Sequence, residues 1–103
     1  MVIEWLQFEV VPTAKAIFIE KDDEIYTSFL KGYPGFLGKE IWVSPREETE
    51  VIVVIHWESK DAWMSVPEAD LIVVEEQFSS AVGADNYRLV EVREYQVRKF
   101  RQV

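Results

Sequence analysis

The stretch Pro34-Gly35-Phe36-Leu37-Gly38-Lys39-Glu40-Ile41-Trp42 decides the fold predicted for this chain. A helical pattern ends just before it, at Lys31-Gly32, and the Pro-Gly pair that follows is typical of a turn. Residues 38–44 then alternate in polarity as a strand does, and Pro45 begins a polar connection of the hairpin type. The segment therefore predicts a helix, a turn and the first strand of a β-hairpin.

The residues around this segment predict three more strands and two helical regions. Alternation over Val2–Val11 indicates a first strand with apolar groups on both faces, and the run 51–55 makes Glu50–Trp57 the most apolar strand. Residues 86–100 predict a long last strand. Apolar spacing of three and four predicts a first helix over Pro12–Leu30, with Pro12 in its first turn.

The second helical region is predicted in two pieces. Ser59 is a good N-cap residue, and Pro67 interrupts the helix after about two turns. Ser65, followed three residues later by Glu68, predicts a capping box at a new helix start, and Gly83 ends that helix. Its expected buried face comprises Leu71, Val74, Phe78, Ala81 and Val82.

The resulting order β-α-β-β-α-β predicts an α+β, ferredoxin-like fold. In this arrangement a four-stranded antiparallel sheet has two helices on one face. The opposite face then needs a cover for its apolar side chains, and a second copy of the same sheet can supply it. We therefore expect a homodimer that pairs through the open sheet face.

Length and composition bound the classes of function. A chain of 103 residues is expected to form one domain, residues 1–103. The formal net charge of −8 repels phosphate groups, so neither nucleic acid nor an anionic membrane is an expected partner. The absence of Cys excludes thiolate catalysis and zinc–thiolate sites. No signal segment or membrane-spanning run is found, and the expected location is the cytoplasm.

Few residues have the spacing of a known reaction centre. His56 is the only histidine, so it is either structural or a haem ligand or proton carrier at a cleft. The acidic pairs Asp22-Asp23, Glu47-Glu48 and Glu75-Glu76 are expected to be solvated surface charge, with general acid–base work as the alternative. No metal site, nucleophile motif or glycine-rich phosphate loop is found, and no cofactor is predicted.

The aromatic side chains are better candidates for a binding site. Helices and sheet of this fold can enclose a pocket, and aromatic walls bind flat apolar molecules by burial and stacking. The alternative is that the same rings fill the core and the dimer interface. The candidate pocket residues are Trp5, Tyr26, Trp42, His56 and Trp63.

Two motifs are similar to the antibiotic-biosynthesis-monooxygenase-like superfamily, whose small ferredoxin-like chains pair into dimeric α/β barrels. They are Pro34-Gly35-Phe36-Leu37-Gly38 after the first helix and Trp57-Glu58-Ser59-Lys60-Asp61-Ala62-Trp63 at the start of the second. The opening Glu4-Trp5-Leu6 and the ending Arg93-Glu94-Tyr95 resemble short, uncharacterised cyanobacterial members.

The resemblance implies two kinds of chemistry. Some members are cofactor-free monooxygenases of polycyclic phenols, for which Trp5, Trp42 and Trp63 are expected as pocket walls and Tyr26 or His56 as the polar partner. Others degrade haem with an Asn, a Trp and a His, but this chain has Trp5, Val66 and Glu76 at or near those positions. The resemblance gives a cofactor-independent oxygenase acting on an aromatic or phenolic molecule as the first expectation, whereas the missing triad and the isolated His56 favour a non-catalytic module.

Two alternatives to an oxygenase stay open. The first is a non-catalytic, small-molecule-binding or regulatory dimeric module. The second is a surface that binds another protein, for which the apolar run Leu71-Ile72-Val73-Val74 is the candidate because it exceeds one helix face. Whether the protein is an enzyme is not decided by the sequence.

Overall fold

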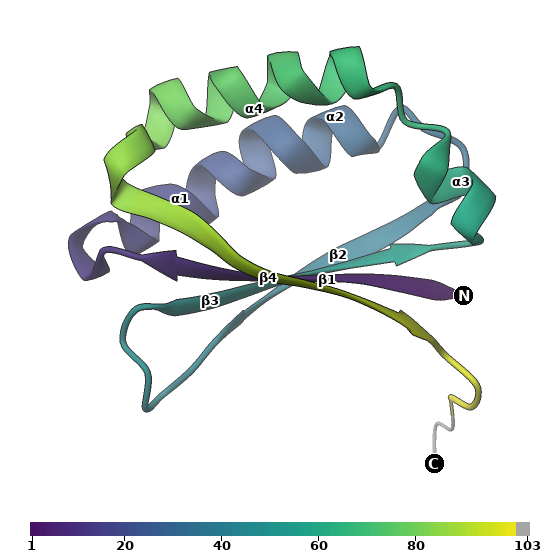
Figure 1. Ribbon diagram of the computed structural model, residues 1–103, viewed down its shortest axis with the longest axis horizontal. Helices are drawn as coiled ribbons and strands as arrows, with labels where there is room; N and C mark the ends of the chain where they lie inside the picture. The colour runs from purple at the N-terminus through teal and green to yellow at the C-terminus, as the bar shows by residue number, and fades with distance from the viewer. Residues whose placement is uncertain (101–103) are drawn as a thin grey trace.

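The computed structural model describes residues 1–100; residues 101–103, the end of the predicted domain, lie outside the described residues. The strands form one antiparallel sheet in the order β2-β3-β1-β4, and the chain order β-α-β-β-α-β confirms the predicted ferredoxin-like fold (Figure 1). The strands are β1 (Val2–Val10), β2 (Phe36–Val43), β3 (Glu50–Trp57) and β4 (Tyr87–Gln96).

All the helices lie on one face of this sheet (Figure 1). The first helical region is continuous, as predicted, but it changes pitch along its length: a 3-10 turn (Pro12–Ala14), α1 (Lys15–Lys21), a π-helical segment (Asp22–Thr27) and α2 (Ser28–Leu30). The second region consists of α3 (Lys60–Met64) and α4 (Glu68–Val82), separated around Pro67. A 3-10 turn (Ala84–Asn86) leads into β4.

The core lies between the helices and the helix-facing side of the sheet. Its five largest fully buried side chains are Val10, Phe18, Val51, Trp57 and Phe78. Phe18 packs against Phe78 with ring centroids 5.1 Å apart and nearly perpendicular planes, a favourable geometry for two aromatic rings. The first helix is therefore tied to both α4 and the sheet.

The π-helical segment keeps one row of the first helix directed at the sheet. Ala14, Phe18, Asp22, Tyr26 and Leu30 follow one another at intervals of four residues. In a regular α-helix each such step turns about 40° too far, so a row of five would wind away from the sheet. The wider π segment reduces this drift, and it brings the polar Asp22 into a row that is otherwise apolar.

A β-bulge has a similar effect in β2. The pairing of β2 with β3 shifts between Phe36 and Gly38, which leaves Leu37 as an extra residue. Without the bulge, Phe36 and Lys39 would face opposite sides of the sheet, because side chains alternate along a strand. With it, Phe36 is opposite Trp57 and Lys39 is opposite Ile55, so both face the helices.

The ends of the second helical region differ in part from the prediction. Ser59 caps α3 as expected, because its hydroxyl accepts a hydrogen bond from the Ala62 backbone NH. The predicted capping box is wrong: the Ser65 hydroxyl donates to the Ala62 carbonyl, and α4 begins after Pro67. Leu71 and Ala81, expected on the buried face of α4, are exposed.

Within residues 1–100, no helix lies over the other face of the sheet (Figure 1). It carries the alternate residues of the strands, among them Ile3, Trp5, Trp42, Val54 and His56. No helix of residues 1–100 combines the length and apolar character that crossing a membrane requires.

Replacing Gly35 with Ala is expected to destabilise the fold by about 2 kcal/mol. Gly35 has φ +88°, and a Cβ there would collide with the Ala62 side chain. Gly32→Ala is the control, because its Cβ would meet only the Phe29 carbonyl oxygen at an ordinary 3.6 Å. Urea denaturation measures both; equal free energies of unfolding for the two variants would contradict this account.

Candidate functional site

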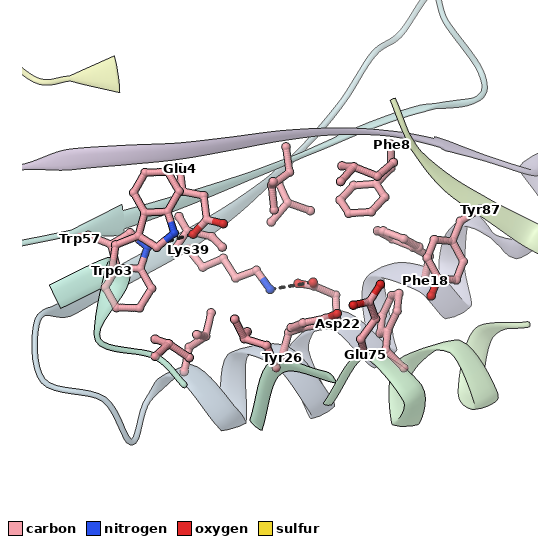
Figure 2. Close-up of a pocket in the computed structure, with 18 of the residues that line it drawn as sticks. Glu4, Phe8, Phe18, Asp22, Tyr26, Lys39, Trp57, Trp63, Glu75 and Tyr87 are labelled. Atoms are coloured by element: carbon pink, nitrogen blue, oxygen red, sulfur yellow. Dashed lines mark hydrogen bonds and ion pairs between the residues drawn. The ribbon is translucent and has the colours of Figure 1, made fainter. Parts of the chain in front are cut away.

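A cavity of about 480 Å³ lies between the helices and the sheet. Its walls are mainly aromatic and aliphatic, and they come from every strand and from both helical regions (Figure 2). Phe18 on α1 and Leu30 on α2 contribute from the row that faces the sheet. The labelled lining residues of Figure 2 are Glu4, Phe8, Phe18, Asp22, Tyr26, Lys39, Trp57, Trp63, Glu75 and Tyr87. The volume suits a ring-containing small molecule.

An ion pair lies inside this cavity. Lys39 Nζ donates a hydrogen bond to Asp22 Oδ1 at 2.6 Å, and the two side chains are only 4% and 6% exposed. Figure 2 shows the pair between an indole end, with Trp57 and Trp63, and a phenyl end, with Phe18 among its rings. A charge buried in apolar surroundings needs a partner of this kind, because its desolvation is otherwise too costly.

Burial changes the proton affinity of both partners. Desolvation raises the pKa of the Asp22 carboxyl above its ordinary value, although the Lys39 ammonium opposes this. Desolvation also lowers the pKa of Lys39, against the opposing effect of Asp22. Each group is therefore closer to exchanging a proton than it would be in water.

A second carboxyl group lies at the indole end. Trp57 Nε1 donates to Glu4 Oε1 at 3.0 Å, and burial raises the pKa of Glu4 despite this hydrogen bond and the nearby Lys39 and Lys60. The indole NH of Trp57 is thus already engaged. Of the residues that line this part of the cavity, Asp22 and Glu4 supply two carboxyl groups and Lys39 supplies one ammonium group.

Tyr26 adds a neutral hydroxyl to the site. It lines the cavity, and Lys39 Nζ lies 5.3 Å from the centre of its ring. Burial raises the pKa of Tyr26, so its hydroxyl keeps its proton at neutral pH and can donate a hydrogen bond to a ligand.

The indole end is held in place from α3. Lys60 Nζ lies 3.8 Å from the centre of the Trp63 ring and also pairs with Glu94 on β4 at 2.6 Å. Some residues that line the cavity are exposed and mark its rim. They include Met64 on α3, Leu71 on α4 and Leu89 on β4.

The structure brings together two of the five residues predicted for the pocket. Tyr26 and Trp63 line the cavity, whereas Trp5, Trp42 and His56 lie on the helix-free face of the sheet and do not. A binding role for any of the five stays a prediction.

The three residues outside the cavity have other contacts. The guanidinium carbon of Arg93 lies 4.9 Å from the centre of the Trp5 ring. Trp42 is 47% exposed. His56 Nε2 lies 2.6 Å from Glu40 Oε1. These contacts belong to the helix-free face and not to the interior site.

The charged groups of the cavity were not identified from the sequence. The expectation that Asp22 is solvated surface charge is wrong, because it is buried and paired with Lys39. Its signal was its place four residues after Phe18 and four before Tyr26. Lys39 had a signal too, because it alternates in step with Ile41 along the strand, and Ile41 packs against the core.

The chemistry available to this site is acid–base chemistry and the stabilisation by Lys39 of negative charge on a ligand oxygen. No cluster of three His, Cys, Asp or Glu suited to a metal ion occurs within residues 1–100. The chain's only imidazole, His56, does not line the cavity, so the site offers no histidine ligand to a haem iron.

Comparison with known proteins relates the chain to one family. The model of the family described as antibiotic biosynthesis monooxygenase matches residues 1–70. No curated protein shows significant similarity to the sequence.

Solved structures of similar fold have low sequence identity to this chain. SnoaB, a cofactor-independent oxygenase from Streptomyces nogalater, is 15% identical with a TM-score of 0.66, and the match covers 96% of this chain and 94% of SnoaB. The heme-degrader MhuD from Mycobacterium tuberculosis is 22% identical with a TM-score of 0.74, covering 99% and 100%. A dimeric ferredoxin-like protein from an uncultured marine organism is 14% identical with a TM-score of 0.74, covering 100% of both chains.

Glu4→Gln is expected to stabilise the protein at pH 7 and to have less effect at pH 4. The folded-state pKa of Glu4 lies above the ordinary value of 4.5. The folded protein therefore binds more protons than the unfolded chain between these two pKa values, and stability falls as the pH rises through that window. The amide removes the charge but still accepts from Trp57.

Urea denaturation at the two pH values measures this effect, with Glu20→Gln on the exposed face of α1 as the control. A gain that is the same at both pH values, or a loss at pH 7, would count against desolvation of Glu4.

Proposed function

The chain belongs to the antibiotic biosynthesis monooxygenase family, and we propose that it is a cofactor-independent oxygenase of an aromatic, phenolic small molecule. The observation that supports this most is the interior cavity with its aromatic walls and its single buried ammonium group, Lys39. A phenol could stack on the walls and direct its oxygen toward this group. SnoaB, with a similar fold, is a cofactor-independent oxygenase, which agrees with the proposal.

The proposed reaction uses the phenol itself as the reductant. A phenol with a free ring position takes up one O2; one oxygen atom becomes the second carbonyl of a quinone and the other leaves as water. For 1-naphthol, C10H8O and O2 give C10H6O2 and H2O, so four electrons pass from the ring to oxygen. The protein contributes a site shielded from water and a cation near the phenolic oxygen, where negative charge develops.

We also propose that the helix-free sheet face pairs with a second copy of this chain. The face carries the exposed rings of Trp42 and Tyr95, along with the partly exposed side chains of Trp5 and Ile52. An apolar patch that no helix covers is typical of a contact between subunits. The dimeric ferredoxin-like protein of similar fold agrees with this arrangement.

Two other expectations stay predictions. They are the likeness to short cyanobacterial members, which rests on Glu4-Trp5-Leu6 and Arg93-Glu94-Tyr95, and the cytoplasmic location.

The function is tested with 1-naphthol in air-saturated buffer. We expect binding in isothermal titration calorimetry and, in an oxygen electrode, uptake of one O2 per naphthol without added metal or cofactor. Trp63→Ala should weaken binding about fivefold, since one aromatic contact contributes about 1 kcal/mol. Trp42→Ala, a matched truncation on the opposite face of the sheet, should leave the affinity unchanged.

Two outcomes would contradict the proposed oxygenase, and a third would contradict the location of its site. Absence of binding would remove the small-molecule site altogether. Binding without O2 uptake would favour the alternative of a non-catalytic binding module. A loss of affinity in Trp42→Ala equal to that in Trp63→Ala would move the site away from the interior cavity.

The dimer is tested by the mass of the protein in solution. Light scattering should give about twice the 12.1 kDa of the chain, and Trp42→Lys should shift the mass toward the monomer by placing a charge in the apolar contact. Ile72→Lys is the control, because Ile72 is similarly exposed at 50% but lies on α4. A monomer for the unmodified chain would refute the proposed pairing.

A further inference from the structure

We propose that Asp22 accepts the proton of the ligand's hydroxyl group while Lys39 binds the oxyanion that results, so that the cavity takes up a neutral phenol and holds it as the phenolate. This inference rests on the proposed function, because it assigns roles to two residues of the same cavity. It also names the chemical class of ligand: a molecule with an acidic hydroxyl group on an aromatic ring, and not a permanently charged anion.

The geometry leaves both groups free for these roles. Lys39 Nζ uses one hydrogen on Asp22 Oδ1, which leaves two for a ligand oxygen. Asp22 Oδ1 accepts this bond, and its other oxygen, Oδ2, accepts none from residues 1–100. Every fully buried polar side-chain atom of these residues has a hydrogen-bond partner. Oδ2 has no such partner, so it is not fully buried, and Asp22 lines the cavity.

Conservation of charge supports a neutral ligand. Before the transfer, the cavity holds the Asp22 carboxylate beside the Lys39 ammonium; afterwards it holds a neutral Asp22 and a phenolate beside the same ammonium. The O–H bond of the ligand breaks, an O–H bond forms on Asp22, and one negative charge moves a short distance without entering or leaving. An incoming anion would instead add a buried charge, at a large desolvation cost.

The other charged groups of the cavity favour the same class of ligand. Besides Asp22 and Lys39, the charged lining residues are Glu4 on β1, Glu75 on α4 and Arg88 on β4, and Asp23 adjoins Asp22 on the first helix. Arg88 is already paired with Glu9, at 3.2 Å. The surplus of carboxyl groups near Lys39 opposes the entry of anions but does not oppose a neutral phenol.

The probe for this proposal is 4-nitrophenol, whose phenolate is yellow and whose neutral form is colourless. At a pH low enough to keep the free probe colourless, the bound probe should be yellow in the unmodified protein. Calorimetry in two buffers of different ionisation enthalpy should show no net proton release, because the proton remains on Asp22.

Three variants separate the roles. In Asp22→Asn the unpaired Lys39 still binds the phenolate, so the bound probe is yellow but about one proton per ligand is released to the buffer. In Lys39→Met the bound probe is colourless. Glu4→Gln tests the other nearby carboxyl group as the proton acceptor and should show no proton release. Asp23→Asn is the control, because Asp23 is exposed and does not line the cavity, and it should behave as the unmodified protein does in both colour and proton release.

A double variant guards against loss of the fold. Removing one partner of a buried ion pair can unfold a protein, whereas removing both charges costs much less. Asp22→Asn with Lys39→Met should therefore stay folded by circular dichroism and bind the probe in its colourless form with no proton release.

The outcomes distinguish this inference from the proposed function. A probe that binds the unmodified protein in its colourless form, or with release of a proton, overturns the roles of Asp22 and Lys39 but leaves a phenol site. Proton release that appears in Glu4→Gln and not in Asp22→Asn makes Glu4 the acceptor and overturns the proposal. If neither 4-nitrophenol nor 4-nitroanisole, which has no hydroxyl, binds at all, both proposals fail together.

Discussion

The ion pair of Lys39 with Asp22 is the interaction on which the interior site depends. Two opposite charges lie within an otherwise apolar cavity, and neither can stay there alone, because an unpaired buried charge costs several kcal/mol. Each therefore requires the other to be directed inward. The π-helical segment provides this for Asp22, and regular alternation with Ile41 along β2 provides it for Lys39.

The same pair divides the cavity into parts of different character (Figure 2). Trp57 and Trp63 form an indole end, which Lys60 links to β4 through Glu94, and phenyl rings form the other end. A flat ligand that fills both ends must pass the polar centre, where hydrogen-bond donors and acceptors are concentrated. The arrangement therefore selects for a ligand with apolar rings and a polar substituent between them.

The order of the strands and helices could be predicted from the sequence, because turn residues and periodicity determine it locally. Side chains alternate along β1, so Trp5 faces the opposite side of the sheet from Leu6 and Phe8. That alternation was enough to exclude Trp5 from a helix-facing pocket. Choosing pocket residues by aromatic character alone led to Trp42 and His56 on the opposite face. Asp22 and its solvated neighbour Asp23 are both acidic, and only the four-residue spacing to Phe18 and Tyr26 distinguishes Asp22 in the sequence.

The bulge at Leu37 has a consequence for the descent of this site. A bulge adds one residue to a strand, so a single-codon deletion of Leu37 would restore regular alternation and still leave Phe36 opposite Trp57 and Lys39 opposite Ile55, both facing the helices. Asp22 would then keep its cation. Homologous chains that lack this residue should accordingly retain both the basic and the acidic side chain, so that the strand can change in length by one residue through evolution while the ion pair stays.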